Sequence, residues 1–180
     1  MNPVKDERLV KKIMPLRFLM CDVDGVLTDG KIIMDHEGNE SKNFNVRDGH
    51  GLKMLLRSGI GVALLTGRQS SVVAHRARDI GIVEVYQGIK NKGEFMDTYL
   101  PEKGLAARQI AYMGDDIVDI PVLKMAGFSI SVADASEYAK AAADYVTQMK
   151  GGEGAVREIC ELILMVQNKW DEVARRYRIG

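Results

Sequence analysis

The segment 17-RFLMCDVDGVLTDG-30 places an apolar run directly before a group of aspartates, Asp22, Asp24 and Asp29. A short apolar run of this kind is typical of a buried strand, and Gly25 allows the chain to turn sharply after it. Carboxylates this close together repel one another unless a cation lies among them. The segment therefore predicts a strand that delivers Asp22 and Asp24 to a cation-binding site.

Strand-like and helix-like runs alternate along the rest of the chain. The other predicted strands are GVALLT, IVEVYQ, QIAYMG, FSISVA and DYVT, at residues 61–66, 82–87, 109–114, 128–133 and 144–147. Helices are predicted at residues 49–57, 70–80, 93–100, 117–125, 136–142 and 154–176. Because strands that are apolar on both faces alternate with helices, we expect an α/β fold, a Rossmann-like three-layer sandwich with a central parallel sheet.

The run KIIMDHEGNESKNFNV at residues 31–46 predicts a β-hairpin flap after the first strand, with its turn at Asp35, Gly38 and Asn39. It is too short to form a separate lid, so we expect a capless fold. Ligands of open α/β sheets bind outside the carboxyl ends of the strands, which places the flap beside the site. The apolar flap side chains should need a neighbouring subunit to cover them; they are Ile32, Ile33, Met34 and Phe44.

Composition favours one globular domain that spans residues 1–180, with a C-terminal helix and tail at about 154–180. The chain has 180 residues, is 46% hydrophobic, and carries 25 basic and 25 acidic side chains. This balanced charge argues against nucleic acid or a membrane as the main partner. The N-terminal run lacks the apolar core of a signal peptide, and Cys21 and Cys160 have the apolar setting of buried thiols, so we expect a cytoplasmic protein.

Polar residues follow consecutive predicted strands, and the carboxyl ends of parallel strands meet at one edge of a sheet. Besides the aspartates of the first strand, this edge receives Thr66-Gly67-Arg68, then Lys90 and Lys92, then Asp115, Asp116 and Asp119. Carboxylates, a hydroxyl with free amides, and an ammonium are the groups that phosphoryl transfer to an aspartate requires.

The chemistry of that reaction assigns the carboxylates. Asp22 is the expected nucleophile, and Asp22 and Asp115 are the natural pair of ligands for Mg²⁺, which prefers oxygen and typically takes one or two carboxylates. Asp24 is expected to protonate the leaving alkoxide and then to deprotonate the attacking water.

The remaining polar groups would hold the phosphate. Thr66 and the amide of Gly67 can donate hydrogen bonds to its oxygens, and Lys92 would balance the charge of nucleophile and phosphate together. Lys90 is interpreted as a solvated surface lysine. For Asp116 and Asp119, a role at a helix N-terminus is as consistent with the sequence as a role in the site.

The motifs DVDGVLTDG, TGR, a lysine within QGIKNKG, and GDDIVD occur in this order and resemble those of the haloacid dehalogenase superfamily of aspartate-nucleophile phosphatases. The runs FNVRDGHG at 44–51 and DYVT..MKGGEGAVREICELIL at 144–164 are similar to the 3-deoxy-D-manno-octulosonate 8-phosphate phosphatase family. The resemblance extends over residues 17–167.

The resemblance implies the same roles for Asp22 and Asp24, and a metal site completed by Asp115 and by the backbone carbonyl of Asp24. If Asp116 has a role in the site, we expect it to support these ligands without binding the metal itself. It further implies contacts to a sugar acid phosphate from Asn45, Val46, Arg47, Asp48, Gly49, Lys53, Arg68, Arg76 and Lys92. It also implies a homotetramer in which hairpin flaps meet and a neighbour helps to close each active site, and a place in lipopolysaccharide biosynthesis.

Other interpretations stay open at this point. Within enzymes, the same capless scaffold could act on a nine-carbon 2-keto sugar acid 9-phosphate. A non-catalytic assembly module would keep the fold and the flap, but would not need Asp22, Asp24, Lys92 and Asp115 together. A phosphorylation-dependent receiver also uses aspartate, threonine, lysine and magnesium, but its phosphoaccepting aspartate ends the third strand, where this chain has VYQG.

Overall fold

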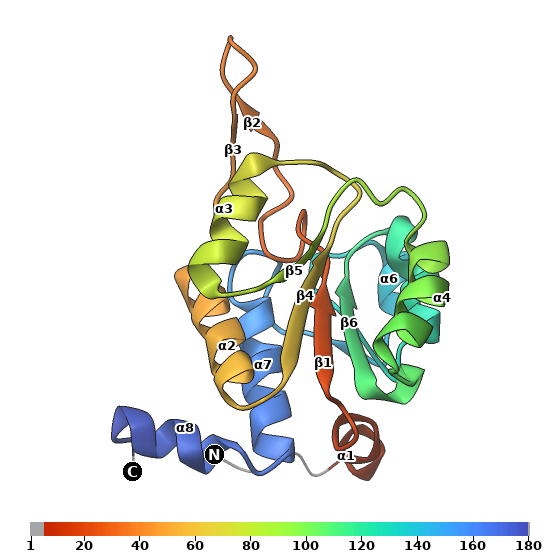
Figure 1. Cartoon of the computed structure of the whole chain (residues 1–180), viewed down its shortest axis with the longest axis vertical. Helices are drawn as coiled ribbons and strands as arrows, with labels where there is room; N and C mark the ends of the chain where they lie inside the picture. The colour runs from red at the N-terminus through yellow and green to blue at the C-terminus, as the bar shows by residue number, and fades with distance from the viewer. Residues whose placement is uncertain (1–5, 180) are drawn as a thin grey trace.

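A parallel sheet of six strands forms the centre of the molecule, in the order β5-β4-β1-β6-β7-β8 (Figure 1). The protein is described by a computed structural model, which covers residues 6–179. The sheet confirms the parallel α/β fold and each strand expected from the sequence. Its strands are β1 (Phe18–Cys21), β4 (Gly61–Leu65), β5 (Glu84–Tyr86), β6 (Ile110–Gly114), β7 (Phe128–Ser131) and β8 (Tyr145–Val146).

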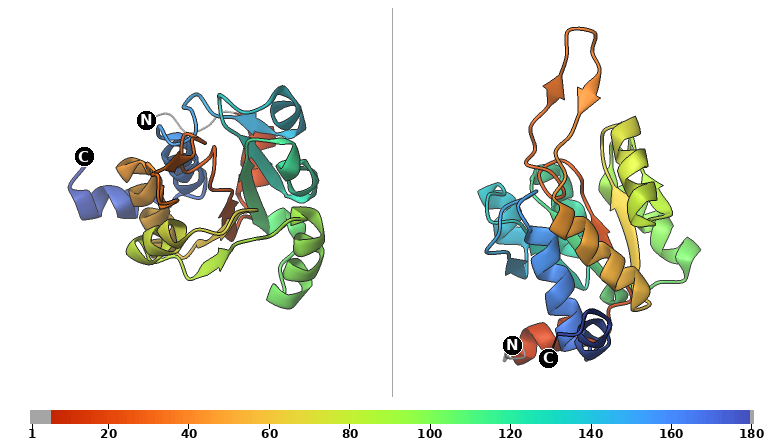
Figure 2. Two further views of the ribbon diagram at one scale, coloured as in Figure 1. Left: turned by 90° about the horizontal axis from the view of Figure 1, so that it is seen from above. Right: turned by 90° about the vertical axis from the view of Figure 1, so that its left-hand side faces the viewer.

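Helices cover both faces of the sheet and make the three layers (Figures 1 and 2). On one face lie α2 (Val46–Arg57), α3 (Ser71–Ile80) and α7 (Ala155–Val166). On the other lie α4 (Lys92–Lys103), α5 (Ile120–Met125) and α6 (Glu137–Ala142), with 3₁₀ turns at Ala107–Gln109 and Ile117–Asp119. The central strands are apolar on both sides because both sides face helices; β1 and β6 are buried along almost their whole length.

The tightest helix pair is α2 against α7, and a small residue allows the approach. Gly51 of α2 lies against Cys160 of α7, where an added Cβ would come within 3.1 Å of the Cys160 Cβ. Asp48 of α2 also accepts hydrogen bonds from the backbone amides of Gly154 and Arg157 at the start of α7, at 3.2 and 2.8 Å. These contacts fix the N-terminus of α2 at the edge of the sheet where β1 ends.

Several boundaries differ from the sequence expectation. The helix α1 (Glu7–Ile13), capped by Asp6, was not expected from the sequence. The single helix expected at 154–176 is two helices, α7 and α8 (Trp170–Tyr177), because the chain turns at Asn168 with φ of 56°. The tail residue Gly180 lies outside the described residues.

The helix α2 begins earlier than expected, since Asn45 caps it by accepting a hydrogen bond from the amide of Arg47 at 2.8 Å. Within residues 6–179, none of the helices combines the length and the apolar character that a bilayer crossing needs.

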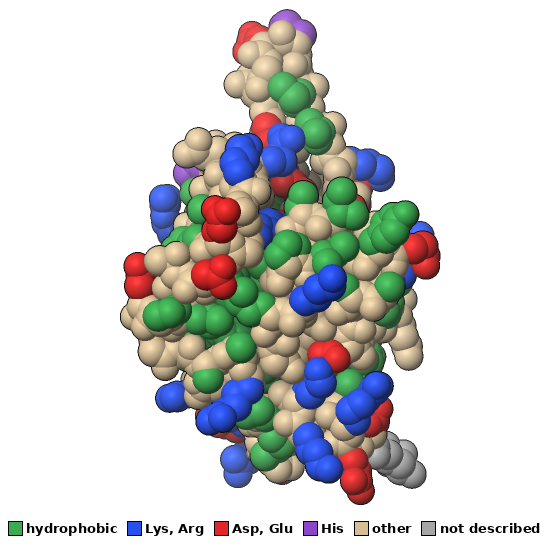
Figure 3. All heavy atoms as spheres, turned by 90° about the vertical axis from the view of Figure 1, so that its right-hand side faces the viewer, with side chains coloured by type: hydrophobic (Ala, Val, Ile, Leu, Met, Phe, Trp, Pro, Cys, Tyr) green, Lys and Arg blue, Asp and Glu red, His purple; other side chains and the backbone are tan. Residues whose placement is uncertain are grey.

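The hairpin between β1 and α2 stands out from the body of the molecule (Figure 2). Its strands are β2 (Ile33–Met34) and β3 (Glu40–Ser41), and Asp35 closes its turn by accepting from the amides of Glu37 and Asn39. Ile32, Ile33 and Met34 are 59%, 39% and 59% exposed, and Figure 3 shows hydrophobic side chains on the protruding hairpin. These exposures agree with the expected apolar flap.

Phe44 is an exception among the flap residues expected to be exposed. It is half-buried and packs against the core, and the guanidinium of Arg76 lies 5.8 Å from its ring centroid. Phe44 therefore does not share the exposure of the other apolar flap residues.

Candidate active site

A cavity of about 340 Å³ lies at the carboxyl ends of β1, β4, β5 and β6. Parallel strands bring residues that are far apart in sequence to this one edge. The residues predicted from the sequence that line it are Asp22, Asp24, Thr66, Gly67, Arg68, Lys92, Asp115 and Asp116.

Lys92 is buried at the start of α4 and pairs with carboxylates from two elements. Its Nζ lies 3.0 Å from Asp22 Oδ1 and 2.6 Å from Asp119 Oδ1, and its side chain is only 3% exposed. A buried ammonium is stable only when it is well paired, so these contacts fix its position. Lys92 is therefore held against the carboxylate that is expected to attack phosphorus.

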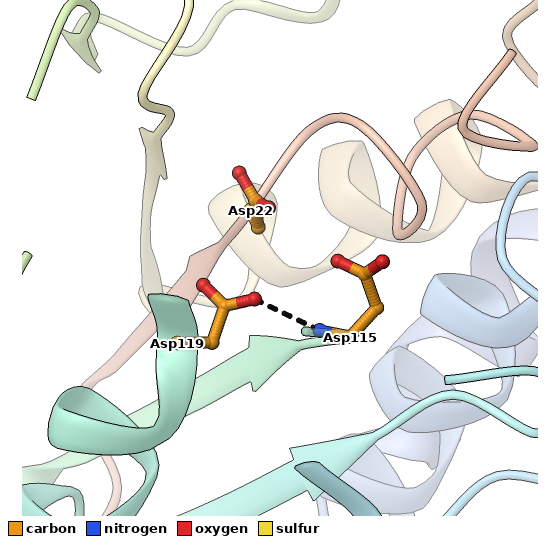
Figure 4. Close-up of side chains that lie close together, drawn as sticks. All are labelled: Asp22, Asp115 and Asp119. Carbon is orange, nitrogen blue, oxygen red and sulfur yellow. Dashed lines mark hydrogen bonds between the residues drawn. The ribbon is translucent and has the colours of Figure 1, made fainter. Parts of the chain in front are cut away.

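Asp119 holds neighbouring groups of the site in place through hydrogen bonds. The sequence left this role undecided. It is fully buried, and its Oδ1 accepts hydrogen bonds from Lys92 and from the hydroxyl of Tyr112. Its Oδ2 accepts from the backbone amide of Asp115 at 3.0 Å (Figure 4). The same oxygen accepts from the amide of Asp116 at 3.2 Å. Both oxygens are thus engaged by protein donors. The four-residue spacing from Asp115, one turn onward, is the sequence signal that could have identified it.

Asp22 and Asp115 form an anionic pair suited to a divalent cation. One carboxylate oxygen from each of Asp22, Asp115 and Asp119 lies within 4.8 Å of the others. Burial raises the pKa of Asp22 to about 7, against the opposing effect of Lys92. Burial, followed by the charge of Asp22, raises the pKa of Asp115 to about 8. Asp115 Oδ1 is buried and has no hydrogen-bond partner within the described residues.

Gly25 allows the loop after β1 to reach Asp115. Its φ is +92°, a conformation that other residues rarely adopt, and any Cβ placed there would collide with the Asp115 carboxylate. The glycine predicted to make a sharp turn therefore also makes room for the carboxylates to meet.

Asp24 is held by cations from two segments. Lys42, at the base of the hairpin, pairs with its Oδ1, and Arg68 Nε lies 3.7 Å from its Oδ2. Glu40 of β3 lies 3.2 Å from Lys42 and 2.6 Å from Arg68. The sequence reasoning missed Lys42 and Glu40. Their spacing of two, which puts both side chains on one face of a strand, was the available signal.

The loop after β4 carries Thr66 and Gly67 to the cavity. Thr66 is buried, and its Oγ1 accepts from the amide of Arg68 at 3.3 Å, while its carbonyl accepts from the amide of Ile89 at 3.1 Å. Lys90 reaches back to the carbonyl of Gly67 at 3.2 Å. These contacts fix the conformation of the loop, in which Thr66 and Gly67 line the cavity.

Of the residues expected to contact the sugar acid, Arg68 and Lys92 line this cavity. The others are not among its lining residues and lie around the start of α2 and on α3. Asp48 caps α7, Arg76 pairs with Asp79 and donates to the carbonyl of Asn45, and Gly49 packs against Arg76. Val46 and Arg47 are exposed, and Lys53 is half-buried on α2. Their contact with substrate stays a prediction, as does the role of Asp116, which is exposed at the cavity rim.

The geometry contradicts the receiver interpretation. A receiver would place its phosphoaccepting aspartate after the third strand of the central sheet, counted along the chain. Here that strand is β5, which ends at Tyr86 and is followed by Gln87. The carboxylate beside the buried lysine instead follows β1.

Comparisons with known proteins show which proteins the chain resembles. A sequence profile described as haloacid dehalogenase-like hydrolase matches residues 75–159. The 3-deoxy-D-manno-octulosonate 8-phosphate phosphatase KdsC of Yersinia pestis is 45% identical over 168 residues, which cover 93% of this chain and 89% of the relative.

Solved structures extend the similarity to three dimensions. The crystal structure of the Moraxella catarrhalis 3-deoxy-D-manno-octulosonate 8-phosphate phosphatase, in complex with a magnesium ion, a phosphate ion and KDO, has a TM-score of 0.93 and 41% identity, covering 96% of this chain and 99% of that chain. The cobalt-bound Haemophilus influenzae deoxy-D-mannose-octulosonate 8-phosphate phosphatase has a TM-score of 0.84 and 43% identity, covering 88% and 92%.

Proposed function

The chain belongs to the 3-deoxy-D-manno-octulosonate 8-phosphate phosphatase family of the haloacid dehalogenase-like hydrolases, and we propose that it hydrolyses that substrate to the free sugar acid and phosphate. The observation that carries the proposal is the Asp22 carboxylate, held 3.0 Å from buried Lys92 and beside Asp115. We assign the reaction to lipopolysaccharide biosynthesis, where the family's product is used.

The residues of the site fit Mg²⁺. Asp115 Oδ1 is buried and has no protein partner within residues 6–179, and the carboxylates of Asp22, Asp115 and Asp119 converge around the ammonium of Lys92, so negative charge is in excess. Asp22 and Asp115 would hold the ion, together with the backbone carbonyl of Asp24, while the engaged oxygens of Asp119 support them. When bound, Mg²⁺ supplies neutralisation of the carboxylates and of the phosphate oxygens.

The protein groups then carry out two displacements at phosphorus. A carboxylate oxygen of Asp22 attacks phosphorus, and the bond to the sugar oxygen breaks as Asp24 donates its proton to that oxygen. Water next attacks the phosphorus of the aspartyl phosphate and gives a proton to Asp24, which restores the Asp22 carboxylate and releases phosphate. Lys92 stabilises the charge that develops on the phosphoryl oxygens.

The groups at the rim bind the substrate. The Thr66 hydroxyl and the Gly67 amide donate to phosphate oxygens, and Arg68 lies at the cavity wall, where it can meet an anionic group of the sugar acid. The residues from Asn45 to Gly49, with Lys53 and Arg76, act on the sugar acid across a subunit boundary, since they do not line the cavity of their own chain.

We also propose the state in which the enzyme works. Residues 1–180 act as one phosphatase domain, and the exposed hairpin residues are buried between subunits of a homotetramer. Cys21 and Cys160 are buried free thiols, in agreement with action in the reducing cytoplasm.

The test is phosphate release from eight- and nine-carbon 2-keto sugar acid phosphates, with Mg²⁺ and with a chelator. We expect Mg²⁺-dependent turnover and preference for the eight-carbon substrate. Asp22→Asn should retain less than about a hundredth of the wild-type rate, since it removes the nucleophile.

The matched control is Asp29→Asn, which changes the other aspartate of the same segment, one that pairs with exposed Lys31. Preference for the nine-carbon substrate would reassign the reaction. An absence of turnover on the whole panel would favour a non-catalytic assembly module.

A further inference from the structure

Lys42 is a buried charge in the site to which the reaction scheme assigns no role. It follows β3 at the base of the hairpin, and its side chain is only 1% exposed. Its ammonium pairs with Asp24 Oδ1 and lies 3.2 Å from Glu40 Oε1. Burying an ammonium is costly unless good partners compensate for its lost hydration. A lysine placed here for folding alone would be an expensive substitute for an apolar residue.

Lys42 is part of a closed ring of four alternating charges. From Lys42 the ring passes to Glu40, then to Arg68, whose Nη2 lies 2.6 Å from Glu40 Oε1. Arg68 Nε lies 3.7 Å from Asp24 Oδ2, and Asp24 Oδ1 closes the ring on Lys42. The ring joins the loop after β1, the hairpin, and the loop after β4.

The ring fixes the Asp24 carboxylate from both sides. The torsion that turns a carboxylate about its Cβ–Cγ bond is soft, so a side chain held at one oxygen keeps rotational freedom. Here Lys42 holds one oxygen and Arg68 approaches the other. Asp24 and Arg68 line the cavity, whereas the Lys42 side chain is almost fully buried, so Asp24 and not Lys42 is open to the substrate.

We propose that Lys42 is a positioning residue: it holds the Asp24 carboxyl group in the orientation from which its proton reaches the leaving oxygen. Glu40 keeps Lys42 and Arg68 in place around it. The proposal rests on the phosphatase function above. It also gives the hairpin a part in the chemistry, because a displacement of the hairpin would move Lys42 and thereby Asp24.

The test compares two leaving groups in Lys42→Met, which keeps the side-chain length and removes the charge. An alkyl sugar phosphate needs its leaving oxygen protonated, whereas para-nitrophenyl phosphate releases a stable phenolate. We expect kcat on the sugar acid phosphate to fall about 10- to 100-fold, and kcat on the aryl phosphate to fall by less than about threefold. Lys42→Arg should restore most of the alkyl activity, since it returns a cation to the same place.

The control is Lys31→Met, which removes a lysine of the same hairpin that is exposed and pairs with Asp29 instead of Asp24. Circular dichroism and light scattering establish that each variant folds and assembles as the wild type does. If Lys42→Met fails to fold, Lys42→Leu, which also offers no donor to Asp24, replaces it in the same comparison.

Equal losses on both substrates, or no loss on either, would overturn the positioning role. A wild-type enzyme that prefers another alkyl phosphate would overturn the proposed substrate instead, and the comparison of leaving groups would then be made with that alkyl phosphate. The two failures are therefore distinguishable.

Discussion

At the scale of single residues, the site is defined by an excess of buried negative charge. Asp22, Asp115 and Asp119 converge within 4.8 Å, and Lys92 is the cation that pairs with two of them. The pKa of Asp22 is raised to about 7 and that of Asp115 to about 8, chiefly by burial. Clustering these buried carboxylates is unfavourable for stability when no further cation is bound. We expect this loss of stability in a site that binds Mg²⁺ together with phosphate.

The first prediction concerns the pH dependence of stability without metal. The folded protein keeps protons on Asp22 and Asp115 that the unfolded chain, with ordinary pKa values of 3.8, has lost. Stability should therefore fall as pH rises from about 4 through about 8. Between about pH 6 and about pH 8.5 we expect the metal-free protein to lose at least about 1.4 kcal/mol, the equivalent of one pKa unit.

Mg²⁺ should reverse this trend, because it favours the ionised carboxylates, and its effect on Tm should be larger at the higher pH. Differential scanning calorimetry of metal-free and Mg²⁺-loaded protein measures both. In the double variant Asp22→Asn and Asp115→Asn, the stability of the metal-free protein should depend much less on pH. A metal-free Tm that rises over this range would contradict the prediction.

A second prediction at this scale concerns Asp119. Asp119→Asn keeps the shape but removes the charge that pairs with Lys92 at 2.6 Å. Lys92 should then lose its fixed position, and kcat should fall about 10- to 100-fold, with a loss of about 1–3 kcal/mol in the free energy of unfolding. Steady-state kinetics and urea unfolding measure the two effects. Asp97→Asn, at an exposed position of α4, is the control, and a wild-type kcat in Asp119→Asn would reduce Asp119 to a helix-terminal residue.

At the scale of elements, the site depends on how helix and strand ends are fixed. Asp48 of α2 accepts from the amides of Gly154 and Arg157, which lie more than a hundred residues later in the chain. The Asp48 carboxylate lies at the N-terminus of α7, where the helix dipole favours an anion. One carboxylate thus connects α2, the glycine-rich turn and α7.

The prediction for this contact is a loss of stability. Asp48→Ala leaves buried amides of the α7 N-terminus without their partner, so the free energy of unfolding should fall by about 2 kcal/mol. Urea unfolding measures it, with Glu137→Gln on α6, where Glu137 pairs with Lys140, as the control. A stable Asp48→Ala protein with a much higher KM would instead support the direct substrate contact that the family resemblance implies.

At the scale of the whole molecule, the open cavity and the protruding hairpin call for a neighbour. Ile32, Ile33 and Met34 are apolar side chains of the hairpin that the rest of the described chain leaves largely exposed. The residues from Asn45 to Gly49 lie near the base of the hairpin but outside their own cavity. Assembly through the hairpins would cover the apolar hairpin side chains. It could also bring the residues from Asn45 to Gly49 to the active site of a neighbouring subunit.

The prediction is that Ile33→Asp weakens assembly. Burying a charge in an apolar interface is costly, so the variant should shift from tetramer to smaller species. Its activity on the sugar acid phosphate should fall more than its activity on an aryl phosphate, because the small substrate needs fewer contacts. Light scattering with parallel kinetics measures both, and Tyr138→Asp, at an exposed position of α6, is the control. A wild-type monomer with full selectivity would refute the assembly.

Much of the fold follows from local pattern. Apolar strands separated by helical runs predicted the parallel sheet, and the placement of Asp22, Asp24, Thr66, Lys92 and Asp115 after those strands predicted the polar edge. The helix ends were harder, since a cap such as Asn45 or a turn such as Asn168 competes with the helical pattern around it. Phe44 was wrongly expected to be exposed, because burial depends on what lies opposite, here Arg76.

The sequence by itself determined the kind of chemistry, because the order of carboxylates, hydroxyl and ammonium along the strands is preserved when parallel strands align their ends. Only the tertiary structure decided which charges are paired. Lys92 pairs with Asp22, 70 residues away, and with Asp119, 27 residues away. Lys42 pairs with Asp24, 18 residues away, from the base of the hairpin. Electrostatic pairing depends on distance and burial, and neither can be read from spacing along the chain.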